Sequence, residues 1–138
     1  MEKIKIEIAN WVHSKRRIVN MIVGISALLL CEAARAYYRP FIYSHDINDF
    51  HVADTLGNSL GTVAAVFVFA ALLGRDRAQD YFLIRTVTIS VLVYEVAHPL
   101  LGKPIDPWDM VATVLAGIFC EVIYRLLHGR PQIVPKGY

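Results

Sequence analysis

Charged residues are scarce in this sequence. They make up 19% of its 138 residues, whereas 56% are hydrophobic, and the mean hydropathy is +0.45. Three signatures of soluble enzymes are missing as well, namely a P-loop, a dinucleotide-binding fingerprint and a His-Glu-x-x-His zinc motif. The shortage of charge argues against an ordinary soluble domain and indicates a membrane protein.

Cysteine is rare too. Cys31 and Cys120 are the only two, both fall inside long apolar runs, and no Cys-x-x-Cys is present. We therefore expect neither a disulfide framework nor a zinc knuckle. No cofactor is indicated.

Long apolar runs are what the sequence does have. A helix needs about 20 residues to cross roughly 30 Å of hydrocarbon. Four runs reach or approach that length, which predicts an all-α fold, a four-transmembrane-helix bundle in a single membrane domain over residues 1–138. The expected spans are about 18–38, 56–74, 82–101 and 108–127.

The segment before the first span has its own pattern. Its apolar residues Ile4, Ile8, Trp11 and Val12 recur at helical spacing among lysines and glutamates. This spacing predicts a short amphipathic helix over residues 1–16 that lies on the membrane interface, with a solvated tail as the alternative.

The first apolar run also has the outline of a signal peptide, with a basic start and an Ala-x-Ala after its core. We expect it to be retained, because Glu32 and Arg35 occupy the region where a cleavage site needs small neutral residues. Leu30, which precedes Cys31, is too bulky for a lipoprotein cleavage site.

Lysines and arginines are divided unevenly between the two sides of these spans. All but Arg35, Arg39 and Lys103 lie in the N-terminal segment, around the middle loop or near the C-terminus. The positive-inside rule then places both termini, including a tail over residues 128–138, in the cytoplasm of a bacterial inner membrane. The basic side favours anionic membrane lipid, and no nucleic-acid partner is needed to explain it.

The two halves of the chain share a pattern that predicts a duplication, with repeat 1 over about 18–74 and repeat 2 over about 82–127. In each half, a helix running outward carries a glutamate followed three residues later by a basic or titratable residue. These pairs are Glu32–Arg35 and Glu95–His98. Two hairpins of the same topology imply parallel repeats about an axis along the membrane normal.

The returning helices correspond as well. Each opens with an aspartate that is followed, on roughly one face, by small or small polar residues. The aligned pairs are Asp54 and Asp109, Gly57 and Ala112, Asn58 and Thr113, and Gly61 and Ala116. We interpret Gly57, Gly61, Ala112 and Ala116 as helix-packing positions, since small residues let membrane helices approach closely.

Carboxylates inside the spans predict a polar pocket that faces outward. Glu32 and Glu95 lie about 20 Å from the cytoplasmic surface at 1.5 Å per residue, and a charge at such depth costs about 2.5–3.5 kcal/mol. Alternatively, each glutamate and its neighbour merely neutralise one another. Glu121, one turn before Arg125, is expected to form such a structural pair. The predicted pocket residues are Glu32, Arg35, Asp54, Asn58, Glu95, His98, Asp109 and Thr113.

The segment YEVAHPLLGKPIDPWDMVATVLAGIF, from Tyr94 to Phe119, and the earlier DTLGNSLG carry a resemblance to a known family. They resemble the VanZ-like membrane proteins, in which Glu-x-x-Gln near the end of one helix precedes Asp-x-x-x-Asn-x-x-Gly at the start of the next. The resemblance covers about 110 residues. The chain departs from the pattern in having His98 for glutamine, Thr113 for asparagine, and Gly117 one residue late.

The resemblance implies a four-helix protein of the cell envelope associated with antibiotic resistance, to the glycopeptide teicoplanin above all, without an agreed reaction. It favours a binding protein whose pocket recognises an envelope lipid, a lipid-linked cell-wall precursor or an amphiphilic, glycopeptide-type antibiotic. A small transport or structural subunit is the first alternative, acting as a homo-oligomer or within a membrane complex.

A membrane enzyme acting on a lipid-linked substrate is the second alternative. Paired carboxylates with a histidine suit general acid–base work. The first loop also offers the metal-ligand candidates His45, Asp49 and His51. Loop histidines and aspartates are more often simply solvated, so we expect no metal, and we favour binding over catalysis.

Overall fold

The computed structural model describes residues 2–129, so the predicted tail over 128–138 falls almost wholly outside the described residues, as do the side chains of Ile8 and Val12. Within that range the chain forms helices and short connections and no strand. The elements are α1 (Glu2–Ala33), the π-helical segment η1 (Ala34–Tyr38), α2 (Arg39–Ser44), α3 (Val52–Leu73), α4 (Arg77–Val96), the 3-10 turn η2 (His98–Leu101) and α5 (Pro107–His128).

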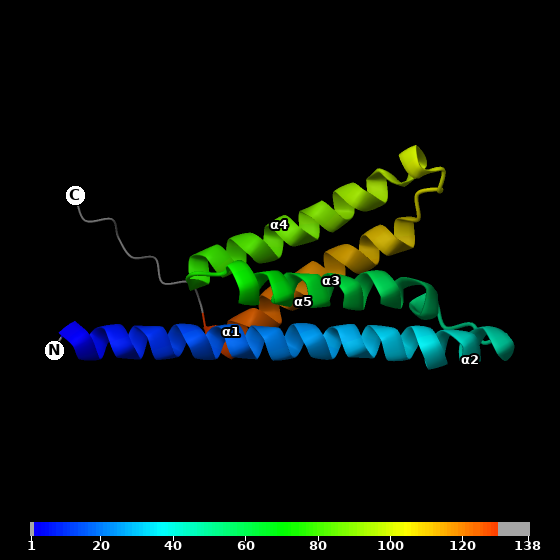
Figure 1. The fold of residues 1–138 in the computed structure, drawn as a ribbon. Helices are drawn as coiled ribbons and strands as arrows, with labels where there is room; N and C mark the ends of the chain where they lie inside the picture. Colours follow the sequence, from blue (N-terminus) through cyan, green and yellow to red (C-terminus); the bar gives the residue numbers. More distant parts are fainter. Residues whose placement is uncertain (1, 130–138) are drawn as a thin grey trace.

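The first helix, α1, is a single rod. Its 32 residues span about 48 Å at 1.5 Å per residue. It is therefore longer than the hydrocarbon core of a bilayer, and its first part projects past the other helices (Figure 1). No break separates the predicted interfacial helix over 1–16 from the first span across residues 2–33, because one continuous helix accommodates both the amphipathic and the apolar pattern.

The first loop is shorter than predicted because the helix continues past Pro40. A proline inside an α-helix lacks a donor N–H and clashes with the carbonyl four residues back. The five-residue π-helical segment η1 widens the helix just before this point, and Pro40 then occupies the first turn of α2, which runs to Ser44. Residues 45–51 alone connect α2 to α3.

Aspartates begin the two helices of the second half. The Asp76 carboxylate accepts a hydrogen bond from the backbone N–H of Gln79 at 2.8 Å, so α4 begins earlier than the expected residue 82. Asp106 accepts from the N–H of Trp108 at 2.9 Å, with Pro107 at the first helical position of α5. α4 ends at Val96 and not at residue 101, because the chain turns into η2 there.

Helix α3 is the centre of the arrangement. It packs against α1, α4 and α5, and α4 and α5 also pack against each other. In Figure 1, α1 lies along one side of α3 and α4 along the other. We call the end formed by residues 13–20, 74–81 and 121–129 the terminal end, and the opposite end, formed by residues 39–58 and 95–109, the loop end.

The helices approach closely at two glycines, Gly24 and Gly117, that were not among the predicted helix-packing positions. A Cβ added at Gly24 of α1 would lie 2.8 Å from Cγ2 of Val68 on α3, and one at Gly117 of α5 would lie 2.8 Å from Oγ1 of Thr88 on α4. The apolar core includes Phe67 of α3, whose side chain is fully buried. Close backbone approach is the role that small residues play in membrane helices.

The expected packing role of Gly57 and Gly61 is not met. A Cβ added at either glycine would point into open space, with no atom of a neighbouring helix within 4 Å, so neither glycine lies at a close helix crossing. Their counterparts behave differently, since Ala116 is buried in the core and Ala112 is half-buried.

Three helical stretches are long and apolar enough to cross a membrane: His13–Ser44, Val52–Leu73 and Pro107–His128. α4 is long enough as well, but Asp80, Arg85 and Glu95 interrupt its apolar sequence. The protein is therefore an all-helical membrane protein, with three candidate spans recognisable from hydropathy.

Candidate functional site

Polar residues from three helices meet at the loop end. Glu95 lies in the last turn of α4, and η2 begins at His98, so these two side chains lie on consecutive turns. Asp109 comes from the first turn of α5, and Asn58 from the second turn of α3. We call Asn58, Glu95, His98 and Asp109 the loop-end cluster.

Glu95 is the centre of this cluster. Its side chain is only 1% exposed. Oε1 accepts a hydrogen bond from Nδ2 of Asn58 at 3.1 Å, and Oε2 lies 3.2 Å from Nδ1 of His98. The ring of Tyr94 meets the His98 imidazole edge-on, with centroids 4.9 Å apart. Glu95 and His98 form an ion pair whenever the imidazole is protonated.

Asp109 adds a second carboxylate. It lies beside Asn58 and within electrostatic range of Glu95 and His98. Its Oδ1 is buried and has no hydrogen-bond partner among residues 2–129, whereas the buried Oε2 of Glu95 has only the His98 imidazole beside it. A buried acceptor without a donor costs about 1–3 kcal/mol, so Oδ1 of Asp109 is the least satisfied atom of the cluster.

Thr113 belongs to the same region but plays a different part. It is fully buried, and its hydroxyl donates to the backbone carbonyl of Asp109 at 2.9 Å. Its donor is thereby used within α5. The sequence had aligned Thr113 with Asn58, yet only Asn58 contributes a side-chain donor to Glu95.

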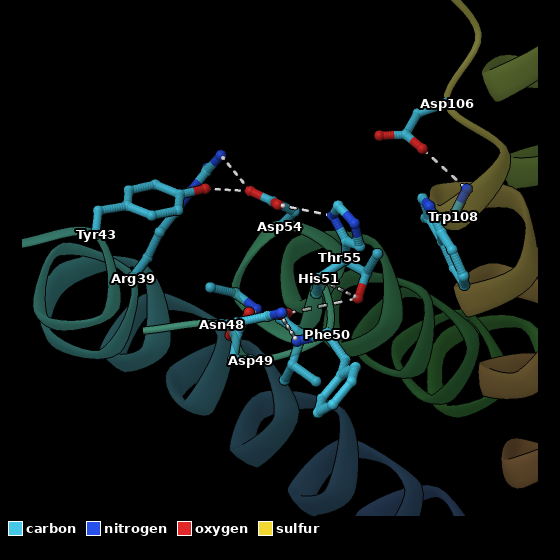
Figure 2. A network of polar contacts seen from close by, with 12 residues as sticks. Arg39, Tyr43, Asn48, Asp49, Phe50, His51, Asp54, Thr55, Asp106 and Trp108 are labelled. Carbon is cyan, nitrogen blue, oxygen red and sulfur yellow. Dashed lines mark hydrogen bonds and ion pairs between the residues drawn. The ribbon is translucent and has the colours of Figure 1, made fainter. Parts of the chain in front are cut away.

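Asp54 forms a separate network at the start of α3, shown in Figure 2. Its carboxylate accepts a hydrogen bond from the Tyr43 hydroxyl and lies 3.7 Å from Nη2 of Arg39, so α2 is tied to α3. On the other side, Nδ1 of His51 lies 3.4 Å from Oδ2 of Asp54, and its ring stacks on Trp108 of α5 at 5.3 Å. These contacts join both loops of the loop end.

This network and the loop-end cluster are neighbours. Arg39 lies within electrostatic range of both Asp54 and Asp109. Asp54 is 40% exposed, whereas Glu95 is nearly inaccessible, so the polar side chains of the loop end extend from the surface into the bundle.

The metal-ligand candidates point to different partners. Asp49 accepts from the backbone N–H of Ala53 at 2.7 Å and from the Tyr38 hydroxyl at 3.3 Å, so it caps the start of α3. His45 is engaged with the carbonyl of Phe41 at 2.9 Å. In the part of the chain that the structure describes, no three His, Cys, Asp or Glu side chains are arranged so that they could hold a metal ion.

Glu32 and Arg35 are not part of the loop-end cluster. They form a surface ion pair of 2.7 Å, with side chains 54% and 71% exposed. Their repeat counterpart Glu95 is 1% exposed, so corresponding positions of the two halves occupy different environments. Glu32 and Arg35 therefore fit the alternative given from the sequence, in which a glutamate and its basic neighbour neutralise each other.

The segment from Gly57 to Gly61 spells Gly-x-Ser-x-Gly, a spacing known from serine hydrolases. That motif needs a sharp strand-to-helix turn to expose the serine. Here the segment lies inside α3, and the Ser59 hydroxyl donates to the carbonyl of Thr55 at 2.7 Å. Ser59 is therefore an ordinary helical serine.

A second buried polar cluster occupies the terminal end, and the sequence analysis missed it. Nε of Arg16 lies 2.8 Å from Oδ2 of Asp80, which also accepts a hydrogen bond from the Tyr124 hydroxyl. Nε2 of His128 lies 2.8 Å from Oδ1 of Asn20. These five residues, the terminal-end cluster, join α1, α4 and α5.

A signal for this cluster was present in the sequence. Asp80, Ile84, Thr88 and Glu95 are spaced by four, four and seven residues, so they share one face of α4. In the structure this face of α4 is turned inward, with Asp80, Ile84 and Glu95 all buried. Gly74 completes the site, since a Cβ there would collide with Oδ1 of Asp80.

Comparison with protein families, curated proteins and solved structures returned no match for the chain.

Proposed function

We propose that this chain is a VanZ-like integral membrane protein of the bacterial cell envelope that binds the polar head of an envelope amphiphile at its loop-end cluster. The observation that supports it is the pair of buried carboxylate oxygens, Oε2 of Glu95, whose one neighbouring donor is the His98 imidazole, and Oδ1 of Asp109, which has no hydrogen-bond donor among the described residues. A ligand that brings donors would satisfy Asp109 and add to the contact that His98 makes with Glu95.

The chemistry of the cluster selects the ligand class. Two carboxylates face one amide and one histidine, so the cluster favours hydroxyl groups and ammonium groups over anions. An envelope lipid, a lipid-linked cell-wall precursor and a glycopeptide-type antibiotic all present such groups beside an apolar body. The apolar body would remain in the membrane, and the donors would reach Glu95 and Asp109.

The proposal includes α4 as the fourth span of a bundle with both termini in the cytoplasm. Asp80 and Glu95 lower its hydropathy, but both side chains are buried inside the bundle. Arg85 is paired with Glu121 of α5. Buried or paired charges of this kind are how membrane helices tolerate ionisable residues. The arginines at the terminal end favour that end as cytoplasmic, which places the loop end outside.

A transport subunit is the second candidate, since buried ionisable residues occur at both ends of the bundle. Fully buried apolar residues, Phe67 and Ile84 among them, lie between the two clusters. A proton or cation path would have to cross this layer. Binding from the outside requires no such crossing, so it is the simpler function for this arrangement.

The test is native mass spectrometry of protein extracted from its own membranes in mild detergent. We expect wild type to carry a bound amphiphile, and Glu95→Gln and Asp109→Asn to lose it, because an amide removes the charge and keeps the shape. Glu32→Gln is the matched control, as this glutamate is exposed on the helix surface. Identical bound species in wild type and in both cluster variants would refute the proposal.

A further inference from the structure

A groove of about 870 Å³ runs between α4 and α5. Its size falls within the range of ligand-binding clefts, roughly 300–1,000 Å³. Most of its walls are apolar, and its charged residues gather toward one end. Residues that line it include Phe82, Ile89 and Leu92 from α4, and Val114, Ile118 and Val122 from α5.

The charged lining residues are Arg85, Glu121 and Arg125. Nε and Nη2 of Arg85 hold the two carboxylate oxygens of Glu121 at 2.5 and 3.3 Å. The sequence had indicated that Glu121 pairs with Arg125 along α5. In the structure it pairs with Arg85 of α4 instead. Arg125, one turn further toward the terminal end, remains exposed beside this pair. The groove therefore carries a net positive charge at the terminal end.

The length of the groove matches one leaflet of a membrane. Eleven residues separate Arg125 from Val114 along α5, or about 16 Å of helix. Half of the hydrocarbon core is about 15 Å. An apolar groove of this length with a basic end has the dimensions of a lipid acyl chain attached to an anionic head group.

We infer that this groove binds an anionic phospholipid of the cytoplasmic leaflet, with an acyl chain between α4 and α5 and the phosphate near Arg125 and Arg85. The inference uses the proposed orientation of the bundle but not the loop-end cluster. Arginine suits the role because its planar guanidinium binds phosphate through two hydrogen bonds. Glu121 competes with the phosphate for Arg85, so it moderates the affinity.

The experiment is a native mass spectrometry titration of the purified, delipidated protein with phosphatidylglycerol and with phosphatidylcholine of the same chains. We expect phosphatidylglycerol to bind more tightly and glycerol 3-phosphate to bind far more weakly, because it lacks the acyl chains. Arg125→Gln should weaken phosphatidylglycerol binding about fivefold, the usual effect of one basic residue near a membrane. Arg75→Gln, at the same end but outside the groove, should leave binding unchanged.

Glu121→Gln gives the sharper outcome. It frees Arg85, so phosphatidylglycerol should bind more tightly than to wild type, whereas a purely structural role of the Arg85–Glu121 pair predicts equal or weaker binding. Equal affinity for the two lipids would overturn the inference, as would insensitivity to Arg125→Gln and Glu121→Gln. If the protein instead forms a dimer that binds no lipid, and Ile118→Trp abolishes this dimer, the groove is an interface with a second copy of the chain. Arg125→Gln and Glu121→Gln alter only the groove, whereas Glu95→Gln and Asp109→Asn alter only the loop end, so failure of this inference and failure of the proposed function are distinguishable.

Discussion

At the scale of single residues, burial separates four carboxylates of this chain into two groups. Asp80 and Glu95 are almost inaccessible and contact side chains from other helices, whereas Glu32 and Asp54 are exposed and paired at the surface. In low-dielectric surroundings a charge depends on its partners far more than it does in water. Substitution of Asp80 or Glu95 should therefore lower the stability of the protein much more than substitution of Glu32 or Asp54.

Asp80→Asn is predicted to lower the free energy of unfolding by about 3–5 kcal/mol, because it leaves the buried guanidinium of Arg16 without its counter-ion. Denaturant unfolding in detergent micelles would measure this loss. The control is Glu32→Gln, the same change in a surface pair, which should leave the unfolding midpoint nearly unchanged. Similar effects of the two variants would contradict the role given to burial.

At the scale of helices, packing is decided by which small residues face a neighbour. Gly24 and Gly117 lie at helix crossings, whereas Gly57 and Gly61 face open space, although all four are glycines within apolar helices. The sequence pattern of small residues led to Gly57 and Gly61, whereas the close helix crossings lie at Gly24 and Gly117. A one-dimensional spacing identifies a stripe but not the helix that covers it.

Gly117→Ala is predicted to destabilise the α4–α5 pair by about 1–3 kcal/mol, the usual cost of overpacking, because the new methyl group collides with Thr88. Thermal unfolding followed by circular dichroism would detect the loss, and adding Thr88→Ala should restore part of it by removing the opposing methyl group. Gly61→Ala should be neutral or slightly stabilising, since it adds no contact and favours the helix. A loss at Gly61 equal to that at Gly117 would reject this assignment of the crossing.

At the scale of the whole molecule, the two polar clusters and the groove have distinct places. The loop-end cluster joins α3, α4 and η2 to α5 beside the Asp54 network, and the terminal-end cluster joins α1, α4 and α5. An apolar core separates them. This separation favours a binding protein that presents different surfaces to the two leaflets.

The proposed orientation predicts a labelling pattern. In a variant with Cys31 and Cys120 replaced by alanine, Phe50→Cys at the exposed loop end should react with a membrane-impermeant maleimide added to intact cells. Arg75→Cys, exposed at the terminal end, should react only after the cells are opened. The reverse pattern would invert the topology and move the proposed amphiphile site to the cytoplasmic side.

The sequence by itself determined the class of the molecule. Its scarcity of charge and its apolar runs were sufficient to predict an all-helical membrane protein, because hydrocarbon leaves few alternatives to a fully hydrogen-bonded helix. It also identified Asn58, Glu95, His98 and Asp109 as candidates, although it grouped them with Glu32 and Arg35. Only the tertiary structure decided which carboxylates are buried, because the exposure of a residue depends on which helix packs against its face. The Asp80–Arg16 pair, the crossing at Gly117 and the Arg85–Glu121 contact each depend on residues more than 25 positions apart. No local pattern encodes such a pairing; it follows from the way the four long helices pack.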